Sequence, residues 1–433
     1  MSEILSDLLL RPVEVGPVES VGLTNIRIGK SQVLPRAEDP DSAQVQEVIA
    51  RWNLWEILNP ANLLGDRIIP IHLEFRDATV YVAQGEDGSL VDLTLAASED
   101  EGPGPVEIQV ASVKAYNANV KVIPAAFDRF DGAGTGGAEP NEPVVPLTLV
   151  GAEAAATLQN WQDGAPQQIL FNTTATLDVA GTTSPLAARG EFRAEQQRVK
   201  ASAHGADLPL EAIAQLAPGP IWVRSGQASG NVSIDYSIDG AWPALQGAAQ
   251  VKDLQVDGGL LPRSLRVTEG TFRFAEQEVD IDQWRMRYGD VSAQVAGTVD
   301  LANSRLSLTD PQGSELESAF DLTVNAPDVG LGELQDTFGL ELPIALEGLV
   351  AAEATLTGTI DNPTLTGRVN TLGPFQVDQV AIETVEAGCL ARSQRWSRFC
   401  PGTVGVRGWP RRCVGPLIGV WISYRSGWRR YFP

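Results

Sequence analysis

The feature that most constrains this chain is a strict alternation of small or apolar residues with polar ones. In GQASGNVSIDYSI, residues 226–238, every second residue from Ala228 to Ile238 is small or apolar, and Ser, Asn and Asp lie between them. Successive side chains of a β-strand point to opposite faces, so this segment predicts a strand with one apolar face. Similar segments recur along the chain and are joined by turns rich in Gly, Asn, Asp and Pro. The pattern predicts an all-β chain.

The alternation changes parity once in a way that predicts a β-bulge. Phe272 and Phe274, then Val279 and Ile281, then Trp284, Met286 and Tyr288 each alternate internally, but the parity flips between Ile281 and Trp284. An extra residue near Asp282–Gln283 would return both sets to the same face. We therefore expect a turn or bulge at this position.

Helical patterns are scarce. The segment DLPLEAIAQLAPG (207–219) predicts a short helix that Pro and Gly stop, and DVGLGELQDTFG (328–339) predicts a second. Residues 42–58 fit either a helix or strands.

An internal repeat has an offset of 120 residues. The motif Pro-x-Leu-x-Gly begins at Pro243 and again at Pro363, and LQVD at 254–257 is echoed by FQVD at 375–378. One of the two predicted helices precedes each copy. Such self-similarity predicts an elongated chain built by adding similar groups of strands.

The expected organisation has four parts. We expect an N-terminal segment of strands at 1–127, a flexible linker rich in Gly, Pro and acidic residues at 128–146, strand repeats at 147–388 and an aberrant tail at 389–433.

The charge of the chain is unevenly distributed. Nine Arg and no Asp, Glu or Lys lie between Gly388 and Pro433, so residues 1–387 hold 23 basic and 55 acidic side chains, a net charge of −32. A surface this acidic repels nucleic acid and anionic membranes, so we expect no nucleic-acid partner. Since all three cysteines lie in the tail, they do not indicate the compartment of the body.

Three segments resemble a known family. They are TGTIDNPTLTGRV (357–369), IDGAWPALQGAAQVKDLQVDGG (238–259) and the opening GPVESVGLTNIRIGKSQVLP (16–35). Together they resemble the translocation and assembly module (TamB-like) proteins of the AsmA-like superfamily, and the opening resembles their cyanobacterial and plastid forms. The resemblance covers most of residues 11–388.

The resemblance implies both a fold and a function. The fold is a long curved β-sheet that forms an open groove with an apolar interior, with a few short helices. The function is lipid transfer and assembly between the inner and outer envelope membranes, with phospholipid and an Omp85-type outer-membrane protein as partners. Family members carry a membrane anchor and a C-terminal domain that are not seen here. We therefore expect a periplasmic, inner-membrane-anchored protein whose membrane contact uses segments missing from this chain.

The alternation predicts which side chains would line such a groove. Taking one face of four segments, we predict as lipid-lining residues Val232, Ile234, Tyr236, Ile238, Phe272, Phe274, Val279, Ile281, Leu356, Ile360, Leu365 and Val369. An alternating strand is equally compatible with the closed core of a β-solenoid, such as an adhesin-like structural protein without bound lipid. That alternative stays open at this point.

No residue pattern indicates an enzyme, a metal site or a cofactor. Glu278, Asp280 and Asp282 share one face and could form a glycosidase-like pair of carboxylates, but a solvated outer face opposite Val279 and Ile281 is the favoured interpretation. The two histidines, His72 and His204, are 132 positions apart without neighbouring cysteines, so we expect no metal. We expect no catalytic residue and no cofactor.

The tail breaks the pattern abruptly. In the first repeat VTEG (267–270) is followed by an alternating strand, whereas VEAG (385–388) is followed by a segment rich in Arg, Trp and Cys. The change favours a shifted reading frame after Gly388 over a basic membrane-surface or nucleic-acid tail.

If the reading frame is shifted after Gly388, the true gene sequence around codon 388 will differ from the nucleotide sequence that gives this tail. Resequencing the gene across that codon checks the prediction. Peptides of the expressed protein that span Gly388 and Cys389 in this frame would contradict it.

Overall fold

The computed structural model describes most of the chain between Arg11 and Ser423. The described residues are 11–36, 40–57, 68–85, 107–125, 144–162, 165–216, 221–237, 242–258, 261–304, 318–338, 346–359, 362–377, 380–382, 386–392 and 418–423.

The N-terminal elements are β1 (Val13–Glu14), β2 (Val18–Val21), β3 (Asn25–Ile28), β4 (Ser31–Val33), β5 (Ser42–Trp52), α2 (Leu54–Ile57), β6 (Ile68–Ala83) and β7 (Glu107–Ile123). The central elements are β8 (Leu147–Gln162), β9 (Ala165–Val179), β10 (Thr182–Arg193), β11 (Arg198–Pro209), α4 (Leu210–Ile213), the 3-10 turn η1 (Ala214–Leu216), β12 (Ile221–Ser237), β13 (Ala244–Gly258), β14 (Leu261–Glu276), β15 (Glu278–Tyr288) and β16 (Val291–Asp300). The C-terminal elements are β17 (Ala319–Gly330), α5 (Leu331–Phe338), β18 (Leu346–Glu347), β19 (Leu349–Thr359), β20 (Pro363–Thr371), β21 (Phe375–Val377), β22 (Val380–Ile382), β23 (Glu386–Arg392) and β24 (Ile418–Ser423).

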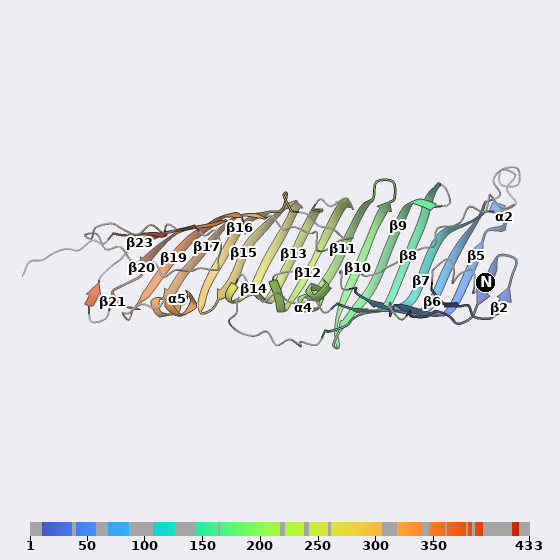
Figure 1. The fold of residues 1–433 in the computed structure, drawn as a ribbon, viewed down its shortest axis with the longest axis horizontal. Helices are drawn as coiled ribbons and strands as arrows, with labels where there is room; N and C mark the ends of the chain where they lie inside the picture. The colour runs from blue at the N-terminus through green and yellow to red at the C-terminus, as the bar shows by residue number, and fades with distance from the viewer. Residues whose placement is uncertain are drawn as a thin grey trace, which may run out of the picture.

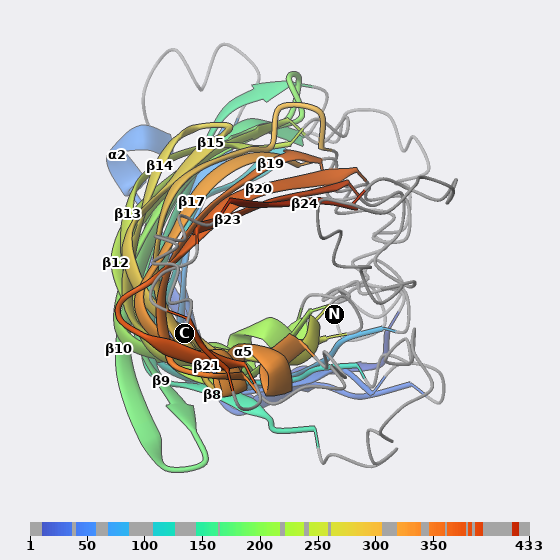
Figure 2. The ribbon, with the colours of Figure 1, turned by 90° about the vertical axis from the view of Figure 1, so that its left-hand side faces the viewer.

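One long sheet dominates the molecule, and its strands lie side by side along the longest axis (Figure 1). Among the described residues this sheet has 21 strands, and β18, β21 and β22 form a separate small sheet. Viewed along its length, the long sheet is an open arc, and α4 and α5 lie on its concave side (Figure 2). The predicted all-β, elongated and curved sheet with a few short helices is confirmed.

Strand order follows the chain closely. From β7 to β17 each strand pairs antiparallel with the next, and the order continues through β19, β20, β23 and β24. The pair β6–β7 is parallel, unlike the other strand pairs of the described chain. At the N-terminal end, β3 and β4 both pair with β5, each along part of its length.

Left-handed residues inside the strands bend the sheet. Asp207 in β11, Asp253 in β13 and Gln283 in β15 have φ values of 50°, 49° and 48°. The strand register shifts at each of these residues. Because an extra residue bends a strand, bulges in neighbouring strands curve the sheet. The bulge at Gln283 confirms the position predicted from the parity change.

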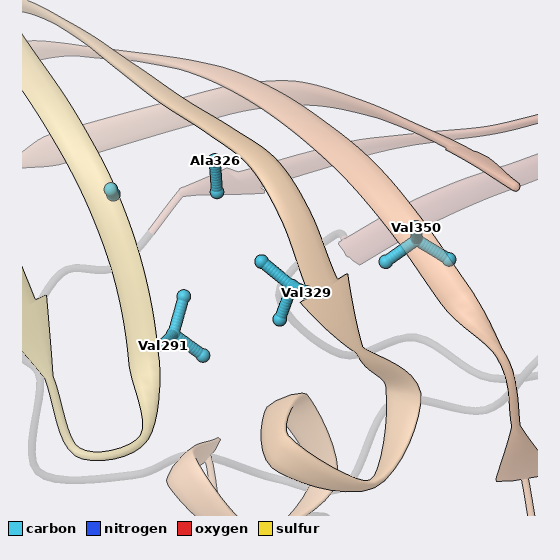
Figure 3. Close-up of a cluster of buried hydrophobic side chains, with 5 residues drawn as sticks. Val291, Ala326, Val329 and Val350 are labelled. Carbon is cyan, nitrogen blue, oxygen red and sulfur yellow. The ribbon is translucent and has the colours of Figure 1, made fainter. Parts of the chain in front are cut away.

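The two helices pack on the concave face and bury its side chains there. Ala212 of α4 is fully buried beside Leu147, Leu177 and Val179. Leu331 and Leu334 of α5 pack against a cluster that includes Val291, Ala326, Val329 and Val350 (Figure 3).

Hydrogen bonds also join these helices to distant segments. Gln84, after β6, donates from Nε2 to the carbonyl oxygen of Leu216 in η1 at 2.9 Å. The hydroxyl oxygen of Thr337 in α5 accepts from the backbone N–H of Asp290 at 3.1 Å. The helices therefore fix one edge of the arc.

Both predicted helices are present, as α4 with η1 and as α5. Residues 42–58, which fitted either structure, form the strand β5 and then the short helix α2. The predicted linker at 128–146 lies outside the described residues except for 144–146. In the tail, β23 continues through Gly388 to Arg392 and pairs with β24, so the backbone stays extended across the change in composition. The shifted reading frame itself stays a prediction.

Substitution of Gly297 tests the close packing of backbones in the sheet. Its φ is +143°, and a Cβ placed there would lie 2.1 Å from the carbonyl oxygen of Asp321. We expect Gly297→Ala to lower the free energy of unfolding by about 2 kcal/mol or more. Urea denaturation followed by circular dichroism measures this.

Gly332→Ala in α5 is the control, because no atom lies within 4 Å of its added Cβ. It should raise the stability by up to about 1 kcal/mol, since alanine favours a helix. Equal unfolding midpoints for the two variants would contradict the assigned geometry.

Candidate functional site

A continuous row of apolar residues crosses the concave side of the sheet, which we call the inner face. From β9 to β20, each residue of this row pairs directly with the next one, and all of them are Ala, Gly, Leu, Ile or Phe. The row consists of Ala175, Leu186, Gly205, Gly230, Ala249, Phe272, Ile281, Gly297, Leu322, Leu356 and Leu365. At ~4.8 Å per strand, this row extends roughly 48 Å.

The inner face contains every described residue predicted to line a groove. A second row, in which Val232, Gly247, Phe274 and Val279 pair across β12 to β15, runs beside the first. Ile234 and Tyr236 lie on the same side of β12 as Val232, and Val369 lies on the same side of β20 as Leu365. Ile238 and Ile360 lie outside the described residues. Their role in binding lipid stays a prediction.

Most of these side chains are not enclosed by a second layer. Tyr236 and Val279 are buried, with 2% and 8% of their surface exposed. The other eight described candidates are only half-buried: Val232, Ile234, Phe272, Phe274, Ile281, Leu356, Leu365 and Val369. Phe272 and Val369 pack against buried clusters that also contact α4 and α5, whereas the other six belong to none of the buried clusters of the described chain. In the part of the chain that the structure describes, the middle of the inner face is therefore one layer of side chains.

An aromatic group on β14 and β15 fills the centre of the inner face. The rings of Phe272 and Trp284 meet edge to face with centroids 4.6 Å apart, and the ring of Phe274 lies 6.1 Å from that of Phe272. Trp284 Nε1 donates to the carbonyl oxygen of Thr271 at 3.3 Å. Trp284 was not among the predicted lining residues, although the parity change at Gln283 implied that it returns to this face.

Gly270 makes room for this indole. A Cβ on Gly270 would lie 2.3 Å from Trp284 Cδ1. The small residue and the large ring are therefore complementary across the strand pair.

The opposite, outer face is polar and charged. Arg27, Glu47, Arg76, Glu74 and Arg51 form one chain of ion pairs over β3, β5 and β6, with N–O distances from 2.9 to 3.6 Å. Ile49 lies on the same side of β5 as Glu47 and Arg51 and is only 1% exposed.

The carboxylates considered for catalysis also lie on the outer face. Asp282 pairs with Arg273 at 2.9 Å, and Asp280 lies opposite Arg273 in the neighbouring strand. His72 is hydrogen-bonded to Ser112 at 2.8 Å. No group of metal-binding side chains occurs among the described residues. Ion pairing on an outer face accounts for Asp282 without a catalytic role.

On this face Asp235 lies between two cations that alter its pKa. Arg198 donates two hydrogen bonds to its carboxylate at 2.6 and 2.7 Å, and Lys200 Nζ lies 3.2 Å from it. These contacts, above all the hydrogen bond from Arg198, lower the pKa of Asp235. Asp235 is therefore ionised and neutralised by its neighbours near neutral pH.

Comparisons with known proteins give no family for this chain: no family model, curated protein or solved structure matches it. Among the described residues, no helix has the length and apolar character needed to cross a membrane.

Replacing Arg198 should change the acid titration of Asp235. We expect Arg198→Gln to move the pKa of Asp235 up toward its ordinary value of 3.8. A carboxyl with a lowered pKa stabilises the folded state above its unfolded pKa, and this contribution is lost as the pH falls through the folded pKa. The acid-sensitive part of the stability below about pH 4 should therefore shrink in the variant.

NMR titration of the Asp235 carboxyl carbon, assigned with Asp235→Asn, measures the shift. Arg189→Gln is the matched control, because Arg189 Nε donates to Ser202 at 3.3 Å instead. A pKa of Asp235 that is the same in wild type and Arg198→Gln would rule out this ion pair.

Proposed function

We propose that this chain shields the acyl chains of phospholipids on its inner face and passes them along the sheet. The observation that carries the proposal is the half-burial of eight apolar side chains on the concave side of a sheet that is not closed. In a closed β-solenoid core, these side chains would be enclosed. The open arc therefore favours a transfer surface over the structural alternative.

The size of the inner face suits lipid chains. Its apolar row extends roughly 48 Å, whereas the hydrocarbon core of a bilayer, which holds two opposed layers of acyl chains, is about 30 Å thick. Covering acyl chains here would contribute about 0.8 kcal/mol for each CH2 removed from water. Movement along a uniform apolar row needs no catalytic group.

In this proposal the inner face contacts lipid and the outer face contacts water. The outer face carries the ion pairs of Asp235, Glu47 and Asp282 and suits an aqueous compartment. With the lipid on the inner face, the chain would bridge two membranes through water.

The cellular setting rests on the resemblance to translocation and assembly module proteins. On that basis we place the chain in the periplasm between the inner and outer membranes, with an Omp85-type outer-membrane protein as its partner. Segments outside this chain would make the membrane contact.

Lipid retention by the purified full chain tests the proposal. Native mass spectrometry and lipid extraction should detect phospholipid on the wild type. Ile234→Asp and Phe274→Asp should each reduce the retained lipid by about tenfold, the factor that 1.4 kcal/mol represents.

Outward-facing positions in the same strands provide matched controls. Ser233→Asp and Ala275→Asp add the same charge on the outer face and should keep their lipid. Circular dichroism should give the same strand content for all four variants. A folded wild type without lipid, or equal lipid loss from inward and outward variants, would refute the proposal.

A further inference from the structure

A polar hollow of about 640 Å³ lies where two neighbouring hairpins end. One hairpin joins β8 to β9, and the other joins β10 to β11 through the turn Ala194–Gln197. The two ends are held together by the backbone N–H of Ala194, which donates to the carbonyl oxygen of Gln167 at 2.9 Å. Five of the eight lining residues are Asn or Gln, and the complete lining is Asn160, Trp161, Gln162, Gln167, Gln168, Arg193, Glu195 and Gln196.

Hydrogen bonds fix part of this lining. Asn160 has φ +54°, a conformation that Asn tolerates, and its Nδ2 donates to Gln168 Oε1 at 2.8 Å. Gln168 Nε2 in turn donates to Glu191 Oε1 at 2.8 Å. Arg193 also donates to Glu191. The chain of contacts holds the amide of Gln168 in one orientation.

A second hollow of about 970 Å³ adjoins this hydrogen-bonded group. Glu191 lines the second hollow and receives the hydrogen bond from Gln168, which lines the first. The second hollow contains Arg189, Arg198 and Lys200 together with Glu191, Asp235 and Glu276. Its cations and acids balance, so this part of an otherwise acidic body has no strong charge of either sign.

We infer that the hollow between the hairpin ends binds a neutral oligosaccharide. Each sugar hydroxyl both donates and accepts hydrogen bonds, and side-chain amides offer both donors and acceptors. The ring of Trp161 can supply the one apolar platform that the C–H face of a sugar ring needs.

Other ligand classes fit these residues less well. An acyl chain would leave the amides without hydrogen-bond partners, at a cost for each group. An extended peptide would need a free strand edge, but β8, β9, β10 and β11 each pair with a strand on both sides. In the hollow itself Arg193 is the one cation, and it is already paired with Glu191, so a polyanion gains little.

Titration calorimetry of the full chain with tetra-N-acetylchitotetraose and with maltotetraose tests the inference. We expect at least one of these neutral tetrasaccharides to bind. Trp161→Ala and Gln168→Ala should each weaken that binding by at least about tenfold.

Two matched variants separate the site from nonspecific binding. Trp55→Ala removes a tryptophan that is 80% exposed and lies outside the hollow, and Gln294→Ala removes an exposed amide on β16. Both should bind as the wild type does.

Saturation-transfer NMR on the wild type would confirm contact between the sugar and the protein, whatever the stability of the variants. Binding of neither tetrasaccharide, or equal weakening by Trp161→Ala and Trp55→Ala, would overturn the inference. Lipid retention on the inner face is independent of this result.

Discussion

The described part of the structure depends on the burial of one apolar face of a single long sheet. A flat layer would leave that face in water, and the hydrophobic effect penalises such exposure in proportion to its area. Two devices reduce the exposed area here. The arc turns the apolar side chains toward one another, and the helices α4 and α5 cover the inner face near one edge. What these devices leave uncovered is the middle of the row from Ala175 to Leu365.

The curvature has a local chemical origin. Residues with left-handed backbone angles, Asp207, Asp253 and Gln283, lie within strands where the register shifts. The extra residue at each bulge also returns the apolar side chains that follow it to the inner face. The same residue therefore bends the strand and keeps its apolar side chains on one face. The glycines of the inner face have the complementary role. Gly270 leaves space for the ring of Trp284, and Gly297 lets the backbone of Asp321 come close.

Much of the fold could be predicted from the sequence because its signals are local. Alternation assigned Ile234 and Phe274 to one face, the parity change located the bulge at Gln283, and helical patterns located α4 and α5. The parallel pairing of β6 with β7 could not be predicted, since the alternation of a strand carries no information about its direction. The lining role of Trp284 was missed, although its signal was present.

The candidate sites were harder to predict than the fold. The hollow at Trp161 depends on two hairpins ending side by side, and the amides of Gln167 and Gln196 look like ordinary turn residues in the sequence. Likewise, alternation alone does not distinguish a closed core from an open arc. That distinction depends on the exposure of residues such as Val232 and Leu356, which only the three-dimensional arrangement supplies.

The sequential order of the strands has a consequence for how such a molecule can change its reach. Because each strand from β7 to β17 pairs with the next one in the chain, one hairpin can be added or removed without rerouting any other connection. Each added hairpin would lengthen the sheet by roughly 10 Å, twice the spacing of adjacent strands. Duplication of short gene segments could therefore change the length of the sheet in steps of one hairpin.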